Sequence, residues 1–155
     1  KLDQVEVVVH PQSILHSAVE FDDGAIIGQM GTPDMRVPIA YALSYPSRLS
    51  NVAKPVNLFE LKALHFEKPD PSVFKCLALA QQAIKMGHPY QIVMNAANEV
   101  AVHAFLDRKI SYPDIAECVY KVLQNDFSQE VCSVQEVLDA DSKARLLAKQ
   151  FLENR

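Results

Sequence analysis

The second half of the chain carries apolar residues at helical spacing, and this feature limits the possible folds most. Apolar side chains recur every three or four residues in four successive stripes, at 73–84, 97–105, 115–123 and 144–152. An amphipathic helix must bury its apolar stripe, and four such helices joined by short links do so by packing against one another. The sequence therefore predicts a four-helix bundle over residues 69–155.

Several residues are expected to mark the ends of these helices. Gly87 is predicted to end the first, because glycine favours the left-handed conformation that stops a helix. Asn95 is predicted to cap the second, with the NAANE segment as a variant of the capping box. A short helical turn at 134–138 is expected to precede the last helix, which Asp139 or Asp141 would cap.

The N-terminal part follows a different period, which indicates strands. Residues 14–21 and 25–30 alternate between apolar and polar side chains, and the Asp23-Gly24 dipeptide between them is typical of a two-residue hairpin turn. In that register, His16 lies opposite Gly31 on the more polar face of the hairpin.

Three further elements are expected before the bundle. A helix is predicted to begin at Thr32, with Asp34 as an alternative cap, and to end at Pro46. Residues 5–9 read as a short buried strand, and residues 63–67 read as another.

The predicted fold class is therefore α+β, with the change of period near residue 68. The part before residue 68 would hold strands and one helix, and the part after it would be helical. The chain begins with Lys1 rather than Met and enters a strand almost at once, which favours a piece of a longer polypeptide.

Composition argues against several classes of protein. The net charge is −4 with no basic cluster, so nucleic acid is not an expected partner, and no apolar run is long enough to span a membrane. Three widely spaced cysteines without a CxxC motif favour reduced thiols in an intracellular protein. Four glycines form neither GxGxxG nor a P-loop, so no nucleotide cradle is expected in this chain.

The segment HPQSILHS is the main candidate for chemistry. His10 and His16 lack a nearby third ligand, which argues against a metal site formed by this pair. His16 is either a satisfied structural histidine or a site residue, and its place at the root of the GTPDM segment favours the second role. Arg36 either binds phosphate or pairs with Asp34.

Three long motifs resemble one enzyme family. HPQSILHS with the later GTPDMRVPI resembles the HPQS-x-x-HS … PDMR-x-PI signature of the 1-deoxy-D-xylulose 5-phosphate reductoisomerases. VMNAANEVAVHAFLDRKISYPDIA and VQEVLDADSKARLLAK resemble later segments of the same family. The resemblance covers nearly the whole chain and implies the C-terminal part of such an enzyme. Residues 1–45 would be the C-terminal portion of the catalytic domain, with strands and one helix of its sheet, residues 46–68 a linker with one strand, and residues 69–155 the helical domain.

The resemblance implies a function for the full enzyme. That enzyme would convert 1-deoxy-D-xylulose 5-phosphate to 2-C-methyl-D-erythritol 4-phosphate in isoprenoid biosynthesis, using NADPH and a divalent cation (Mg, Mn or Co). His16 is implied as a catalytic residue, with Pro33 and Met35 as walls of the substrate pocket. Neither the cofactor nor the metal is expected to bind this chain, which alone would be inactive.

The resemblance also implies a homodimer in the bacterial cytoplasm, or in a plastid if the source is a plant or alga. An alternative of a different class stays open, in which the chain is a non-catalytic dimerisation or binding module with a structural hairpin.

Overall fold

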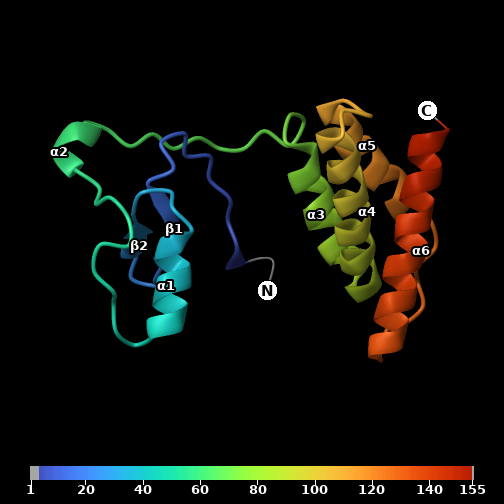
Figure 1. The fold of residues 1–155 in the computed structure, drawn as a ribbon, viewed down its shortest axis with the longest axis horizontal. Helices are drawn as coiled ribbons and strands as arrows, with labels where there is room; N and C mark the ends of the chain where they lie inside the picture. The colour runs from blue at the N-terminus through green and yellow to red at the C-terminus, as the bar shows by residue number, and fades with distance from the viewer. Residues whose placement is uncertain (1–3, 155) are drawn as a thin grey trace. The chain divides into compact units, whose positions relative to one another are not determined.

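A computed structural model describes residues 4–154, which form a two-stranded antiparallel sheet and six helices (Figure 1). The α+β fold class is therefore confirmed. The elements are β1 (Leu15–Glu20), β2 (Ile26–Met30), α1 (Arg36–Ser44), α2 (Leu58–Leu61), α3 (Lys75–Met86), α4 (His88–Leu106), α5 (Tyr112–Leu123) and α6 (Val134–Glu153). They divide into two compact units: Glu6–Pro69 holds β1 to α2, and the helices after Asp70 form the other. No helix in the described part of the chain combines the length and apolarity that a membrane span requires.

The helical unit is organised around α4, which packs against α3, α5 and α6. Small residues permit this close packing: Ala97 and Ala101 of α4 share one buried cluster with Ala144 and Ala148 of α6, and all four are fully buried. α5 contributes most of the largest fully buried side chains, including Leu123. The four helices thus pack apolar sides against one another, as expected. The predicted stripe of the first helix is only partly right, because α3 buries Leu79 and Ala83, whereas Val73 and Ile84 are 69% and 43% exposed.

The break between α3 and α4 lies at Gly87, whose φ of 107° is readily available only to glycine. The prediction for this residue is confirmed. The predicted N-cap at Asn95 is wrong, because α4 already begins at His88, with a proline in its first turn. Asn95 instead lies within α4 and donates a hydrogen bond to Glu99 (3.4 Å).

The predicted division of the last helix is also wrong, because α6 runs without interruption from Val134 to Glu153. Its N-terminus is fixed by a capping box, in which Ser133 and Glu136 each accept a hydrogen bond from the other's backbone N–H. Asp139 and Asp141 therefore lie within α6 and do not cap a helix. Asp141 forms an ion pair with Arg145, one turn later in the same helix.

β1 and β2 form the expected hairpin, but its register differs by one residue from the prediction. Glu20 pairs with Ile26, and the turn has three residues (22–24) instead of two. Gly24 adopts a φ of 83° at the last position of the turn, which is typical of three-residue hairpin loops.

A second irregularity in the pairing occurs at His16. The pairing passes from Leu15↔Met30 to Ser17↔Gln29, so His16 is an extra residue in a β-bulge. The bulge moves the pairing one more residue away from the predicted register, so that the backbone N–H of Gly31 bonds the carbonyl of Ile14. The His16 ring nevertheless lies beside Gly31, although the pairing that predicted this neighbour was wrong.

The two other predicted strands are absent from the described residues. Val9 and Glu67 form only an isolated bridge, with N–O distances of 2.9 Å in both directions. Val7 and Val8 are exposed, so the prediction of a buried strand at 5–9 is wrong. A single bridge provides too few hydrogen bonds to hold an extended segment as a strand.

Helix α1 ends at Ser44, just before Tyr45 and Pro46, as the sequence predicted. Its start differs from the first expectation, since the Thr32 hydroxyl donates a hydrogen bond to the Lys54 carbonyl and does not cap the helix. The alternative, Asp34, accepts the backbone N–H of Arg36 at 2.9 Å, although the helix boundary itself falls at Met35.

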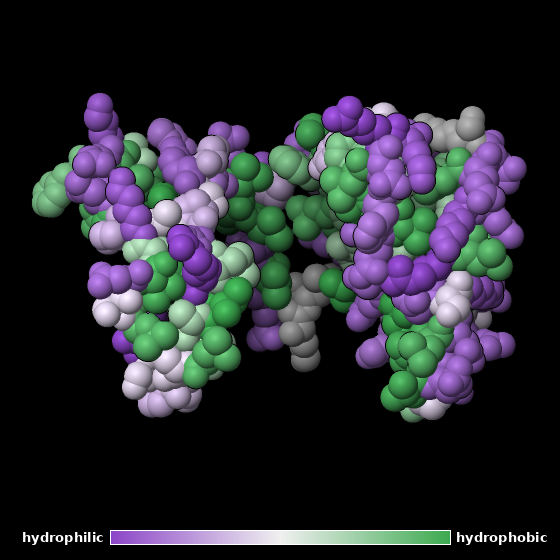
Figure 2. All heavy atoms as spheres, viewed as in Figure 1, coloured by the Kyte–Doolittle hydropathy of each residue, from purple (hydrophilic) through white to green (hydrophobic). Residues whose placement is uncertain are grey.

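The two units differ in how much apolar surface they bury. Figure 2 shows hydrophobic side chains at the surface of the Glu6–Pro69 unit, whereas the visible face of the helical unit is mostly hydrophilic. Exposed residues of the hairpin include Val19, Phe21, Ile26 and Ile27, and Ile14 is the only buried hydrophobic residue described in this unit. Apolar surface of this kind usually meets another surface in the functional protein.

Candidate functional site

The three residues proposed from the sequence, His16, Pro33 and Met35, line one cavity of about 720 Å³ in the Glu6–Pro69 unit. β1 supplies His16, and the segment between β2 and α1 supplies the other two. The structure therefore brings the three residues together, while their part in binding remains a prediction. A cavity of this size can hold a small phosphorylated molecule.

His16 faces this cavity with both ring nitrogens free of hydrogen-bond partners among residues 4–154. The ring lies against Gly31: a Cβ placed there would be 3.6 Å from Nε2 of His16 and 3.9 Å from Cδ2. A larger residue at position 31 would therefore crowd the imidazole. His16 is exposed and unpaired in this part of the protein, which does not fit a buried structural histidine whose hydrogen bonds are satisfied.

His10 lies in a different environment, and it attaches two parts of the chain to each other. Its Nδ1 donates to the carbonyl of His65 (2.7 Å), and its ring stacks on Phe66 with centroids 4.7 Å apart. Gln12 accepts the backbone N–H of His65 and also bonds its ring. These contacts give His10 a structural role.

The described residues offer no set of side chains that could hold a metal ion. Residues 4–154 contain no group of three or more His, Cys, Asp or Glu side chains arranged to hold an ion. The residues of the cavity are mainly apolar or aromatic, so its described walls suit recognition of an organic ligand better than coordination of a cation.

The loop that carries Pro33 and Met35 is fixed by an ion pair. Arg36 contacts Asp34 at 2.5 Å through Nη2 and at 3.0 Å through Nε. Hydrogen bonds from the guanidinium and the backbone N–H of Arg36 lower the pKa of Asp34 to about 2. Arg36 is therefore committed to Asp34, the second of its two expected roles, and the exposed Met35 side chain forms an apolar wall.

Among the cavity residues that the sequence did not point to are Tyr41 and Arg48. The guanidinium carbon of Arg48 lies 4.1 Å from the centroid of the Tyr41 ring, within the range of a cation–π contact. Tyr41 lies three residues after Pro38, another cavity residue, but the sequence alone did not indicate that this helix face borders a cavity. No sequence pattern pointed to Arg48, which lies beyond the end of α1.

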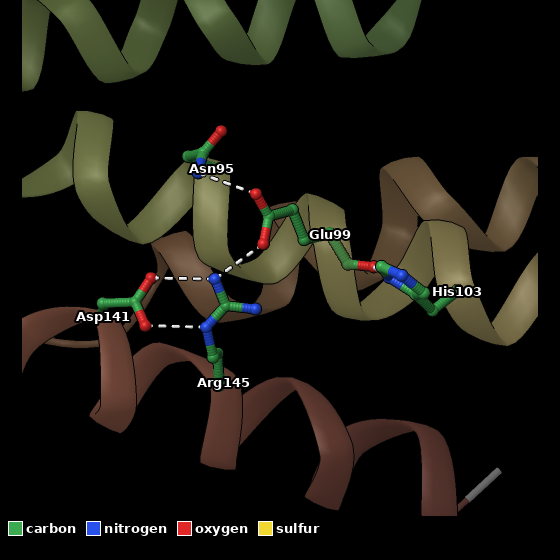
Figure 3. A network of polar contacts seen from close by, with 5 residues as sticks. All are labelled: Asn95, Glu99, His103, Asp141 and Arg145. Atoms are coloured by element: carbon green, nitrogen blue, oxygen red, sulfur yellow. Dashed lines mark hydrogen bonds and ion pairs between the residues drawn. The ribbon is translucent and has the colours of Figure 1, made fainter.

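A polar network in the helical unit joins α4 to α6 (Figure 3). Arg145 donates two hydrogen bonds to Asp141 (2.6 and 3.1 Å) and one to Glu99 (2.7 Å). Asn95 donates a further bond to Glu99, and His103 donates from Nδ1 to the Glu99 carbonyl (2.7 Å).

The charges in this network stabilise one another. The hydrogen bonds and charge of Arg145 lower the pKa of Glu99, and the two acidic partners raise the pKa of Arg145. Each charged side chain of the network, Glu99, Asp141 and Arg145, thus bonds another member of the network. This arrangement suits helix-to-helix attachment.

Comparison with known proteins gives a consistent result. The sequence model of the family described as "DXP reductoisomerase C-terminal domain" matches residues 30–147. The 1-deoxy-D-xylulose 5-phosphate reductoisomerases of Trichlorobacter lovleyi and Pseudomonas fluorescens SBW25 are 51% and 49% identical to this chain over 96% and 97% of its length. The chain spans 38% of the length of each of these two relatives.

Solved structures agree with the sequence comparison. The reductoisomerase of Zymomonas mobilis in complex with NADPH has a TM-score of 0.88 and 43% identity over 99% of this chain. A DOX-P reductoisomerase with fosmidomycin and magnesium has a TM-score of 0.84 and 41% identity over the same share. This chain covers 40% of each of those chains. It belongs to the 1-deoxy-D-xylulose 5-phosphate reductoisomerase family.

Proposed function

We propose that this chain is the C-terminal part of an NADPH- and divalent-metal-dependent reductoisomerase that converts 1-deoxy-D-xylulose 5-phosphate to 2-C-methyl-D-erythritol 4-phosphate. Family membership supports the reaction, and the relatives crystallised with NADPH and with magnesium support the cofactors. The bacterial relatives favour a bacterial cytoplasmic enzyme in the isoprenoid pathway.

The cavity around His16 is proposed as one wall of the substrate site. The observation that carries this proposal is an exposed imidazole, with both nitrogens unpaired in the described part of the chain, beside the apolar wall of Pro33 and Met35. A neutral imidazole donates from one nitrogen and accepts at the other, so His16 can orient a substrate hydroxyl or the aldehyde intermediate. Met35 and Pro33 would exclude water from the carbon chain.

The NADPH and the cation are proposed to bind outside this chain. The described residues form no metal-ligand cluster, and the four glycines of the sequence form no nucleotide-binding loop. The residues that hold both groups would lie in the rest of the full enzyme, and residues 1–155 alone would be inactive.

A second candidate function is a dimerisation or binding module. The exposed apolar surface of the hairpin supports it, since residues such as Ile26 and Ile27 are 67% and 66% exposed. In the enzyme proposal, the same surface is covered by the remainder of the protein or by the second subunit of a homodimer.

The test compares the product of the full parent gene with residues 1–155 alone. NADPH oxidation is followed with 1-deoxy-D-xylulose 5-phosphate and added Mg²⁺ or Mn²⁺. We expect turnover by the full protein that requires both substrate and cation, and none by the shorter chain. A folded full-length protein without turnover would leave the binding module as the better proposal, and activity of residues 1–155 alone would contradict the assignment of cofactor and metal binding to other residues.

A further inference from the structure

We infer that Thr32 is a positioning residue for the substrate pocket, which it stabilises through a hydrogen bond to the segment that follows α1. This inference rests on the proposed function, because it assigns a role within the same site. Thr32 has no place in the reaction as proposed above, where only His16, Pro33 and Met35 contact the substrate.

The position of Thr32 in the chain gives the bond its importance. Gly31 on one side contacts the His16 ring, and Pro33 on the other side forms the apolar wall. The Thr32 hydroxyl donates to the Lys54 carbonyl at 2.6 Å, a short distance for a neutral hydrogen bond. A displacement of Thr32 would therefore move both the neighbour of His16 and the wall opposite it.

The segment that accepts this bond is itself held to the same unit at both ends. Before Lys54, the Arg48 guanidinium lies over the ring of Tyr41. After Lys54, the bridge between Val9 and Glu67 and the contacts of His10 attach residues 65–67 to the strand segment that leads into β1. The Lys54 carbonyl thus belongs to a segment, residues 48–67, that is held at both ends. The Thr32 hydrogen bond attaches the pocket loop to the interior of this segment.

The hydroxyl is not needed to start α1. Asp34 accepts the Arg36 backbone N–H and the Arg36 guanidinium, while Thr32 makes no capping contact. Removal of the hydroxyl should therefore loosen the attachment of the loop without melting the helix that follows. This separation makes the position suitable for a kinetic test.

The test uses the full-length enzyme with Thr32→Val, which keeps the shape of the side chain but removes the donor, and Thr32→Ser, which keeps the donor. We expect Thr32→Val to raise the KM for the sugar phosphate by about three- to tenfold, the effect of one neutral hydrogen bond. The kcat should stay within about twofold, because the wall contacts substrate and transition state alike, and the KM for NADPH should not change. Thr32→Ser should restore the original KM.

A matched control is available in the same unit. Ser44 donates a comparable hydrogen bond from its hydroxyl to the Ser47 carbonyl (2.8 Å), but it does not line the cavity. Ser44→Ala should leave the KM unchanged. The inference is overturned if Thr32→Val is kinetically silent in an active enzyme, if Thr32→Ser raises the KM as much, or if Ser44→Ala gives the same rise.

Hydrogen exchange provides a second readout that does not depend on turnover. In Thr32→Val, backbone amides near residues 31–36 and 53–57 should exchange faster than in the parent protein, and Ser44→Ala should not alter them. Unchanged exchange at both segments would overturn the inference even if the enzyme proved to have another substrate. Absence of turnover with the sugar phosphate in the unmodified full-length protein would instead contradict the proposed function.

Discussion

The packing of the helical unit predicts a large loss of stability for Leu123→Ala. Leu123 is 1% exposed and belongs to the cluster shared by α3 to α6. The substitution removes three carbon atoms, each of which contributes about 0.8 kcal/mol when buried. The cavity left behind adds to this loss, so the free energy of unfolding should fall by about 3–4 kcal/mol. In a unit of this size, each kcal/mol lowers the melting temperature by about 4–8 °C.

The matched control is Leu146→Ala, the same substitution at a position of α6 that is 56% exposed. It should cost less than about 1 kcal/mol, since little buried area is lost and alanine favours the helix slightly more than leucine. Thermal unfolding of residues 1–155 followed by far-ultraviolet circular dichroism reports mainly on these helices. Equal shifts for the two variants would refute the assignment of Leu123 to the core.

Three further predictions concern the thiols, the pocket wall and the bundle network. Burial raises the pKa of the Cys118 thiol to about 11, so a thiol reagent should modify the exposed Cys76 and Cys132 quickly in the native protein and Cys118 only on unfolding; equal rates would contradict the packing of α5. Met35→Ala in the full-length enzyme should raise the KM for the sugar phosphate more than it lowers kcat, and a loss confined to kcat would argue against an apolar wall. Because the folded-state pKa of Glu99 lies below its ordinary value of 4.5, its ionised form adds stability above that pH, and this contribution is lost as the pH falls through the lower folded pKa. Glu99→Gln should therefore destabilise the chain at pH 7 and much less at pH 3, as measured by urea unfolding at the two pH values.

The sequence predicted the helices better than their boundaries. The spacing of apolar residues located the four helices of the bundle. A helix can bury an apolar stripe on one side only if apolar residues recur every three or four positions. Asn95 and Asp141 were mistaken for caps, since the same side chains suit a helix end and a polar contact between helices. Only the fold shows that Asp141 faces Arg145 one turn later.

The hairpin shows that a site residue can be predicted from the sequence even when the register of its strands is predicted wrongly. The sequence favoured a two-residue turn at Asp23-Gly24, but the turn includes residue 22, and the bulge at His16 shifts the pairing by one more residue in the same direction. Bulges leave little trace in the alternation of apolar and polar residues, so the sequence could not predict this one. The His16 ring lies beside Gly31 even though both deviations move the backbone pairing away from the predicted one.

The cavity residues Tyr41 and Arg48 and the bond from Thr32 to Lys54 depend on contacts between distant segments. A bond between residues 32 and 54 has no periodic pattern that would reveal it. The bridge between Val9 and Glu67 is likewise a long-range contact, and the two predicted strands around it did not form. Local patterns therefore indicated where the site residues occur, whereas the walls and supports of the pocket required the fold.

The most direct test of the account is a comparison of His16→Gln with His10→Gln in the full-length enzyme. Glutamine keeps one donor and one acceptor but loses the ring geometry. Because His16 faces the cavity unpaired in the described chain, we expect its substitution to lower kcat/KM by about 10- to 10⁴-fold with little change in melting temperature. His10 is held by His65 and Phe66, so its substitution should lower the melting temperature with little kinetic effect. If His16→Gln is kinetically silent, or if its whole effect follows a lowered melting temperature, His16 is a structural residue and the proposed substrate site is wrong.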